Sequence, residues 1–149
     1  MRRLLSLLVV LLLPALAWAQ PQPTLPQSPL SIVTADGKTH RFTVELAVTA
    51  DQMARGMMFR RTMAPDAGML FDYGRTTPGV AFWMKNTLIP LDMIFIDAAL
   101  TVRYIHAKAV PLSERNITSP IDVRYVLEII GGDAARLGIA IGDKVERRP

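Results

Sequence analysis

Two acidic residues lie in apolar segments, where a carboxylate could do chemistry. Asp92 interrupts "LIPLDMIFI" and Glu128 interrupts "YVLEII". A carboxylate among apolar side chains is rarely buried without a partner. Asp92 would brace the Lys85–Leu88 loop, pair with Lys85, or form the charged wall of a pocket. Glu128 would either form a structural ion pair or face a ligand.

Basic and aromatic residues nearby have the chemistry to recognise a ligand. The segment "RGMMFRR" places three arginines beside methionines, which suit adaptable binding surfaces. Trp83, next to Lys85, could stack on a sugar or an aromatic group, although such residues also fill cores. The predicted ligand-binding residues are Arg55, Met58, Arg60, Trp83, Lys85, Asn86, Asp92 and Glu128.

Three function classes are compatible with these residues. A non-enzymatic module that binds a small anionic or sugar-like ligand is favoured. The first alternative is an envelope-glycan hydrolase that uses Asp92 and Glu128 as its acid and base. The second is a structural or protein-interaction module. The chain has no Cys, and His40 and His106 lie in separate segments. These features favour a protein that is not an enzyme, and no metal or cofactor is expected.

The first nineteen residues have the pattern of an export signal. Arg2 and Arg3 precede the apolar stretch "LLSLLVVLLLPAL", and Ala17-Trp18-Ala19 fits a cleavage site. The stretch is shorter than the roughly 20 residues of a membrane span, so no stable insertion is expected. We predict a periplasmic or secreted protein that begins at Gln20.

The charge of the predicted mature chain is small. The full chain has 17 basic and 13 acidic side chains, and loss of Arg2 and Arg3 leaves a net charge of +2. This balance gives no reason to expect a nucleic-acid partner. A small molecule or an envelope glycan is the expected partner, and the oligomeric state is left open.

The remaining chain divides into a Pro-rich tether, residues 20–29, and one domain, residues 30–149. Asp36-Gly37 predicts a hairpin, and residues 39–49 alternate between apolar and polar as a strand does. Thr49 and Gln52 form a capping-box pattern that begins one short helix at residues 50–58, disturbed near Gly56. A single helical turn is predicted from an N-cap at Asp133 to a C-cap at Gly138. Further strands are predicted at residues 68–71, 80–84, 91–96, 102–105, 125–130 and 144–146.

This series of short strands predicts a mainly β domain, a β-sandwich or a barrel. The segments "RGMMFR", "MLF", "FWMKNTLIPLDMIFID", "YVLEIIGG" and "LGIAIGD" resemble the bacterial and archaeal family called domain of unknown function 192, DUF192, over about residues 45–146. The resemblance implies a small β-rich domain, similar to a jelly roll, with a short helix. It brings no established activity, so no catalytic residues are carried over.

Overall fold

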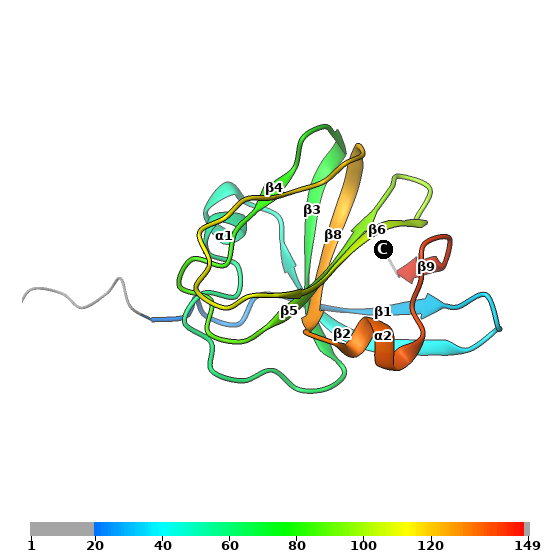
Figure 1. The fold of residues 1–149 in the computed structure, drawn as a ribbon, viewed down its shortest axis with the longest axis horizontal. Helices are drawn as coiled ribbons and strands as arrows, with labels where there is room; N and C mark the ends of the chain where they lie inside the picture. The colour runs from blue at the N-terminus through cyan, green and yellow to red at the C-terminus, as the bar shows by residue number, and fades with distance from the viewer. Residues whose placement is uncertain (1–19, 148–149) are drawn as a thin grey trace, which may run out of the picture.

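A computed structural model describes residues 20–147, and the predicted export signal lies outside these residues. Strands dominate the fold, and two short helices accompany them (Figure 1). The mainly β prediction is therefore confirmed. The elements in chain order are β1 (Gln27–Val33), β2 (Thr39–Ala47), α1 (Ala50–Arg55), β3 (Ala67–Thr77), β4 (Ala81–Phe82), β5 (Leu91–Ile96), β6 (Val102–Ala109), β7 (Ile117–Thr118), β8 (Val123–Ile130), α2 (Asp133–Leu137) and β9 (Lys144–Arg147).

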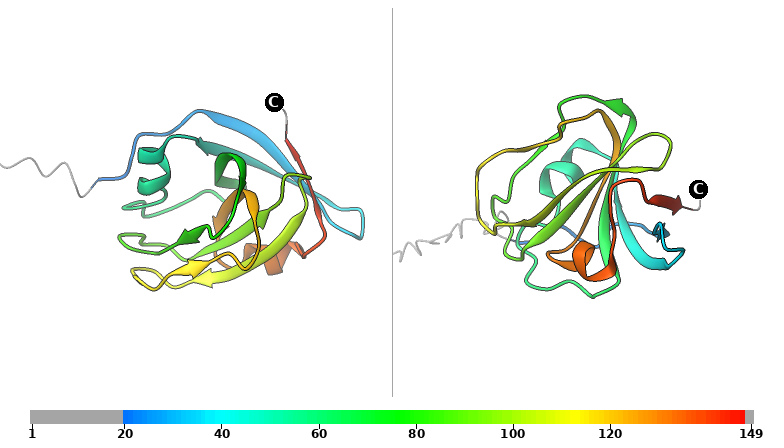
Figure 2. Two further views of the ribbon diagram at one scale, coloured as in Figure 1. Left: turned by 90° about the horizontal axis from the view of Figure 1, so that it is seen from above. Right: turned by 45° about the vertical axis from the view of Figure 1, so that its right-hand side comes forward.

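Seven strands form one curled sheet in the order β6-β5-β8-β3-β2-β1-β9, and β4 and β7 form a separate ribbon. The predicted β1–β2 hairpin is present, and β2 and β3 run parallel with α1 in their connection. The sheet curls until β9 approaches the start of β6 (Figure 2). There Lys144 lies opposite Thr101, and the Val145 N–H donates to the Leu100 carbonyl at 2.8 Å. The sequence predicts a β-sandwich or a barrel. The structure has a curled sheet that forms a half-barrel.

Alternation along the central strands buries both faces of the sheet. All six residues of β5 are buried, with Ile94 on one face and Met93 and Phe95 on the other, as the pattern predicts. One core, the seven-strand core, receives Leu, Ile, Val and aromatic side chains from all seven strands. Its buried members are Leu30, Ile32, Phe42, Val44, Leu70, Ile94, Ile96, Val102, Tyr125, Leu127, Ile129, Ala134, Ile139 and Val145.

The opposite face carries the methionines of the described chain. The chain has eight methionines, of which Met1 is not described. This face has a second hydrophobic core. Four of the other seven methionines are buried in this core, two pack against it, and one lines a cavity beside it that is described below. We call this the methionine core; its buried members are Ala47, Met57, Met69, Phe71, Val80, Met84, Leu91, Met93, Phe95, Ala109, Val123 and Val126.

Helix α1 begins as the sequence predicts and ends earlier. The Thr49 hydroxyl accepts a hydrogen bond from the Gln52 N–H, and the Gln52 side chain accepts one from the Thr49 N–H. The helix ends at Arg55 because Gly56 has a φ of 46°, outside the helical region.

Helix α2 confirms the helical turn predicted before Gly138. Asp133 is its first residue, however, and Gly132 is the N-cap, so the prediction of Asp133 as N-cap is wrong. Across residues 20–147, neither helix has the length and apolar character needed to cross a membrane.

The Pro-rich segment, residues 20–29, contacts the domain at several points. Strand β1 already begins at Gln27. The Leu25 N–H donates to the Glu45 carboxylate at 2.8 Å, and the Gln22 side-chain amide donates to the Gly56 carbonyl at 2.9 Å. Leu25 also packs against the methionine core. The segment therefore holds the end of α1 in place beside the sheet.

Candidate ligand-binding site

Glu128 occupies the centre of the sheet on the methionine side. It lies on β8 between Met69 of β3 and Met93 of β5, and only 4% of its surface is exposed. Its Oε2 atom has no hydrogen-bond partner among residues 20–147. Burial raises the pKa of Glu128 to about 8, and the positive charge of Arg60 offsets only part of this. The carboxyl is therefore mostly protonated at neutral pH.

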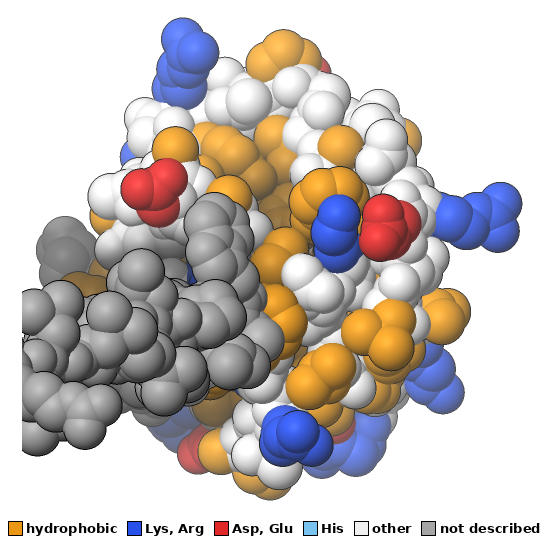
Figure 3. All heavy atoms as spheres, turned by 90° about the vertical axis from the view of Figure 1, so that its left-hand side faces the viewer, with side chains coloured by type: hydrophobic (Ala, Val, Ile, Leu, Met, Phe, Trp, Pro, Cys, Tyr) orange, Lys and Arg blue, Asp and Glu red, His pale blue; other side chains and the backbone are white. Residues whose placement is uncertain are grey.

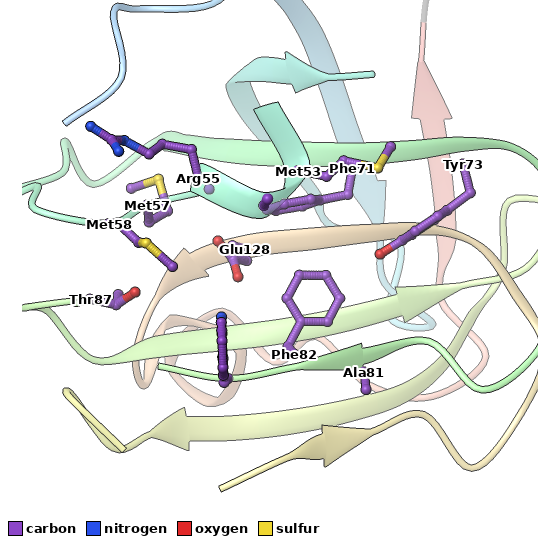
Figure 4. A pocket seen from close by; sticks show the side chains of 13 residues that line it. Met53, Arg55, Met57, Met58, Phe71, Tyr73, Ala81, Phe82, Thr87 and Glu128 are labelled. Atoms are coloured by element: carbon purple, nitrogen blue, oxygen red, sulfur yellow. The ribbon is translucent and has the colours of Figure 1, made fainter. Parts of the chain in front are cut away.

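A cavity of about 260 Å³ adjoins Glu128 (Figure 4). Its walls come from α1 and the turn after it, from β3, and from the segment around β4. The rings of Phe71 and Phe82 meet edge to face, with centroids 5.0 Å apart and planes at 89°. The lining residues are Met53, Ala54, Arg55, Gly56, Met57, Met58, Phe71, Tyr73, Ala81, Phe82, Trp83, Thr87 and Glu128.

Tyr73 supplies a second polar group to this largely apolar space. Figure 4 shows its hydroxyl and the Glu128 carboxyl pointing into the same cavity. Burial, and then the charge of Glu128, raise the pKa of Tyr73 to about 12. The phenol therefore remains protonated and can donate a hydrogen bond at neutral pH.

Trp83 lies at the mouth of the cavity with 45% of its surface exposed. The Lys85 ammonium is 5.2 Å from the Trp83 ring centroid and 3.9 Å from the Glu114 carboxylate. The Asn86 carbonyl accepts a hydrogen bond from the Phe59 N–H at 2.8 Å, which ties the mouth loop to the segment after α1. Apolar side chains gather around a hollow on this face (Figure 3).

The nearby arginines are engaged away from Glu128. Arg60 donates through both of its terminal nitrogens to Glu45. Burial raises the pKa of Glu45, but hydrogen bonds from Arg60 and from the Leu25 N–H outweigh this effect and hold the pKa below its ordinary value. Arg55 donates to the Gln20 carbonyl, and Figure 4 shows its guanidinium directed away from Glu128.

Asp92 lies on the other face of the sheet. Adjacent strands pair Asp92 with Ile129, so its side chain and that of Glu128 point to opposite sides. Its Oδ1 accepts the N–H groups of Lys108 and Gly132, and its Oδ2 accepts that of Ala134, at 2.7–2.8 Å. Asp92 is thus a loop brace, but not for the Lys85–Leu88 loop as the sequence predicts. It joins β6 to the turn that begins α2.

The structure brings together most of the predicted site residues. Arg55, Met58, Trp83 and Glu128 line the cavity. Lys85 and Asn86 line a shallow groove that continues from its mouth. Arg60 and Asp92 lie outside both. Within residues 20–147, His, Asp and Glu form no group of three that could hold a metal ion.

Sequence reasoning missed the aromatic walls of the cavity. Met69, Phe71 and Tyr73 alternate along "MLFDY" and therefore share one face of β3. This alternation was the available signal, but only the pairing of β3 with β8 reveals that this face also carries Glu128. The lining residues absent from the predicted set are Met53, Ala54, Gly56, Met57, Phe71, Tyr73, Ala81, Phe82 and Thr87.

The fold and the site define a small, curled β-sheet domain with a carboxyl-bearing apolar cavity. The sequence pattern of the family DUF192, described as "Uncharacterized ACR", matches residues 31–147. The chain belongs to this family, which confirms the resemblance seen in the sequence. No curated protein matches the chain.

Solved structures share this fold. A protein from Sinorhizobium meliloti 1021, named a "putative transcription regulator", is 49% identical with a TM-score of 0.82, and the match covers 85% of this chain and 97% of that one. A protein of unknown function from Novosphingobium aromaticivorans DSM 12444 is 41% identical with a TM-score of 0.80, and the match covers 86% of this chain and 90% of that one. Neither name states a ligand.

Proposed function

We propose that this domain binds a small organic molecule in the cavity, with Glu128 as its polar anchor. One observation carries the proposal: an almost fully buried carboxyl oxygen without a partner faces a cavity. An unsatisfied buried polar group costs about 1–3 kcal/mol, and a bound ligand that hydrogen-bonds to it would remove this cost. The surrounding Met and aromatic side chains supply the apolar contacts typical of small-molecule sites.

The cavity favours some of the expected ligands over others. An anionic ligand would place its charge beside Glu128, while Arg55 and Arg60 are engaged elsewhere. A sugar-like ligand could stack on Trp83, but inside it would meet mainly apolar walls. The lining therefore supports a compact ligand with an apolar body and one polar group.

The glycan-hydrolase alternative loses its geometric basis. A glycosidase needs two carboxyl groups on either side of one bond. Asp92 and Glu128 point to opposite faces of the sheet, and Asp92 is fully buried among backbone N–H groups. These two residues do not form one catalytic site.

The name of the Sinorhizobium protein suggests a role in regulation. For this chain we propose at most a ligand-sensing contribution to such a role. Helices α1 and α2 have six and five residues, and the common DNA-binding motifs place a longer helix in the major groove. The cavity, rather than a helix, is the feature that supports the proposal.

A fragment screen by ligand-observed NMR tests the proposed function. We expect hits on the parent protein whose affinity falls at least about tenfold in Glu128→Gln, which corresponds to the loss of about 1.4 kcal/mol. Glu146→Gln is the matched control, because Glu146 is an exposed carboxylate on β9. The absence of any hit, or hits that bind both variants equally, would contradict the proposal.

A further inference from the structure

Among residues 20–147, the cavity contains a carboxyl group but no cation that is free to neutralise it. Arg60, the cation whose charge acts on Glu128, already makes two hydrogen bonds to Glu45. Lys85 lies outside the cavity, against the Trp83 ring. Arg55 contributes to the cavity wall, but its guanidinium is directed outward to Gln20. An ionised Glu128 would therefore be an unbalanced negative charge.

The rest of the lining suits a positive charge without a strong hydration shell. Phe71 and Phe82 form two walls at right angles, and Trp83 and Tyr73 add further aromatic surface. Aromatic rings attract cations through their electron-rich faces, and this attraction is the usual means of binding alkylated ammonium groups. The thioethers of Met53, Met57 and Met58 are soft and polarizable and can adapt to alkyl groups.

We propose that the ligand is a small organic cation, an alkylated amine whose positive centre contacts the Glu128 carboxylate within this aromatic and methionine-lined cavity. The inference rests on the proposed function and specifies its ligand class. A volume of about 260 Å³ fits a compact organic group and greatly exceeds the space that a single metal ion requires.

Binding of a cation should displace the proton of Glu128. The titratable and charged groups near the carboxyl are Arg60, from the segment after α1, and Tyr73, on β3. Tyr73 keeps its proton near neutral pH, because its pKa is raised to about 12. Because the free carboxyl is mostly protonated there, a cation that requires its ionised form releases a proton as it binds.

Choline and its neutral carbon isostere, 3,3-dimethylbutan-1-ol, provide the experiment. Isothermal titration of the full mature chain should show that choline binds at least about tenfold more tightly, a difference of about 1.4 kcal/mol. Glu128→Gln should abolish this preference, while Glu146→Gln should retain it. Equal affinity of the two compounds, or an unchanged preference in Glu128→Gln, would overturn the proposal.

Proton release gives a measurement on the parent protein that does not depend on the folding of a variant. Titrations in buffers of different ionisation enthalpy should show close to one proton released per choline at about pH 7 and almost none at about pH 10. Release that does not fall with pH would also overturn the proposal. If neutral fragments bind but cations do not, only the ligand class is wrong; if nothing binds, the proposed function fails as well.

Discussion

At the scale of single residues, Asp92 and Glu128 are two carboxyl groups that are similarly buried but differ in their hydrogen-bond partners. Both carboxyls lie within central strands, and both are at least 95% buried. Asp92 is surrounded by three backbone N–H donors, which replace the water it loses on folding. Glu128 has an oxygen without a donor, and burial shifts its pKa upward. The first arrangement supports the fold, and the second leaves a group available to a ligand.

Asp92→Asn should destabilise the protein by about 1–3 kcal/mol. An asparagine oxygen can still accept the N–H groups of Lys108 and Gly132. Its NH₂ group would then face the N–H of Ala134, so two donors would meet and the Ala134 hydrogen bond would be lost. Urea unfolding of the variant beside the parent measures the change. Glu128→Gln is the comparison and should stabilise the protein at neutral pH, because the Glu128 carboxyl of the parent must take up a proton on folding and the glutamine need not. Equal losses in both variants would make Glu128 a structural residue.

The titration of Glu128 predicts a particular dependence of stability on pH. Its pKa is about 8 in the folded protein and has the ordinary value of 4.5 in the unfolded chain. Between these values the folded state holds a proton that the unfolded state has lost, so raising the pH favours unfolding. The free energy of unfolding of Glu128→Gln minus that of the parent should therefore rise with pH across this window, by about 1.4 kcal/mol per unit.

Unfolding curves of the two proteins at several pH values between 5 and 8 provide this difference. Glu45 and Asp72 have lowered pKa values, so their contributions are lost at more acidic pH and cancel between the two proteins. A difference that stays constant or falls with pH would show that Glu128 is ionised in the folded state.

At the scale of elements, the segment before β1 holds the cavity wall that α1 provides. The Gln22 side chain donates to the carbonyls of Gln52 and Gly56, at the end of α1, at 3.2 and 2.9 Å. The Gln52 carbonyl also accepts the Gly56 N–H, whereas the Gly56 carbonyl lies beyond the last helical residue and has no partner inside the helix. Gln22→Ala should lower stability by about 0.5–1.5 kcal/mol and increase amide exchange in α1.

Hydrogen–deuterium exchange followed by mass spectrometry measures the effect on α1. Gln20→Ala is the matched control, because Gln20 contacts Arg55 through its backbone carbonyl, which the substitution retains. Unchanged exchange in Gln22→Ala would mean that α1 is held by its capping box and its packing alone.

The sequence predicted a helix or strand correctly where the pattern that defines it spans only a few neighbouring residues. The capping box at Thr49 and the alternation in Leu91–Ile96 are such signals, and both are confirmed. The strand predicted at residues 80–84 is limited to Ala81–Phe82, because the Met84 N–H donates to the Ser113 carbonyl in a neighbouring loop. Strand β3 extends to Thr77 through polar residues, and Arg124 and Arg147 both contact Asp72 there.

The candidate site was partly predictable for the same reason. Glu128 is conspicuous as the one acid in "YVLEII", and "RGMMFRR" shows its methionines and arginines directly. The partners of Asp92 lie 16, 40 and 42 residues away along the chain, so no local pattern could have named them. The pairing of Arg60 with Glu45 likewise depends on how the segment after α1 returns to β2.

At the scale of the whole molecule, the described domain begins close to the predicted cleavage site. Gln20, the predicted first residue of the mature chain, already contacts Arg55. We expect N-terminal sequencing of the native protein to begin at Gln20, because the pattern at Ala17–Ala19 suits cleavage and the apolar stretch is too short for a span. Native protein that retains Met1 and sediments with membranes would contradict this expectation.

We propose that the two cores on either side of the sheet have different roles, one in stability and the other in the proposed binding. The seven-strand core joins every strand of the sheet and contains branched apolar side chains, which adopt few rotamers. The methionine core adjoins the cavity and contains flexible side chains that can repack around a ligand. A truncation in one core should therefore have a different effect from a truncation in the other.

Leu127→Ala and Met58→Ala test this division. Leu127 is fully buried in the seven-strand core, and its truncation should cost about 2–5 kcal/mol, because the surrounding strands can relax only partly into the space. Met58 is partly exposed at the cavity, so its truncation should cost less than about 1 kcal/mol while weakening the binding of fragments or choline. Urea unfolding and titration of both variants measure the two effects. The two variants could instead lose the same amount of stability. In that case the methionine core would support the fold as much as the seven-strand core does, and its methionines would serve packing rather than a ligand.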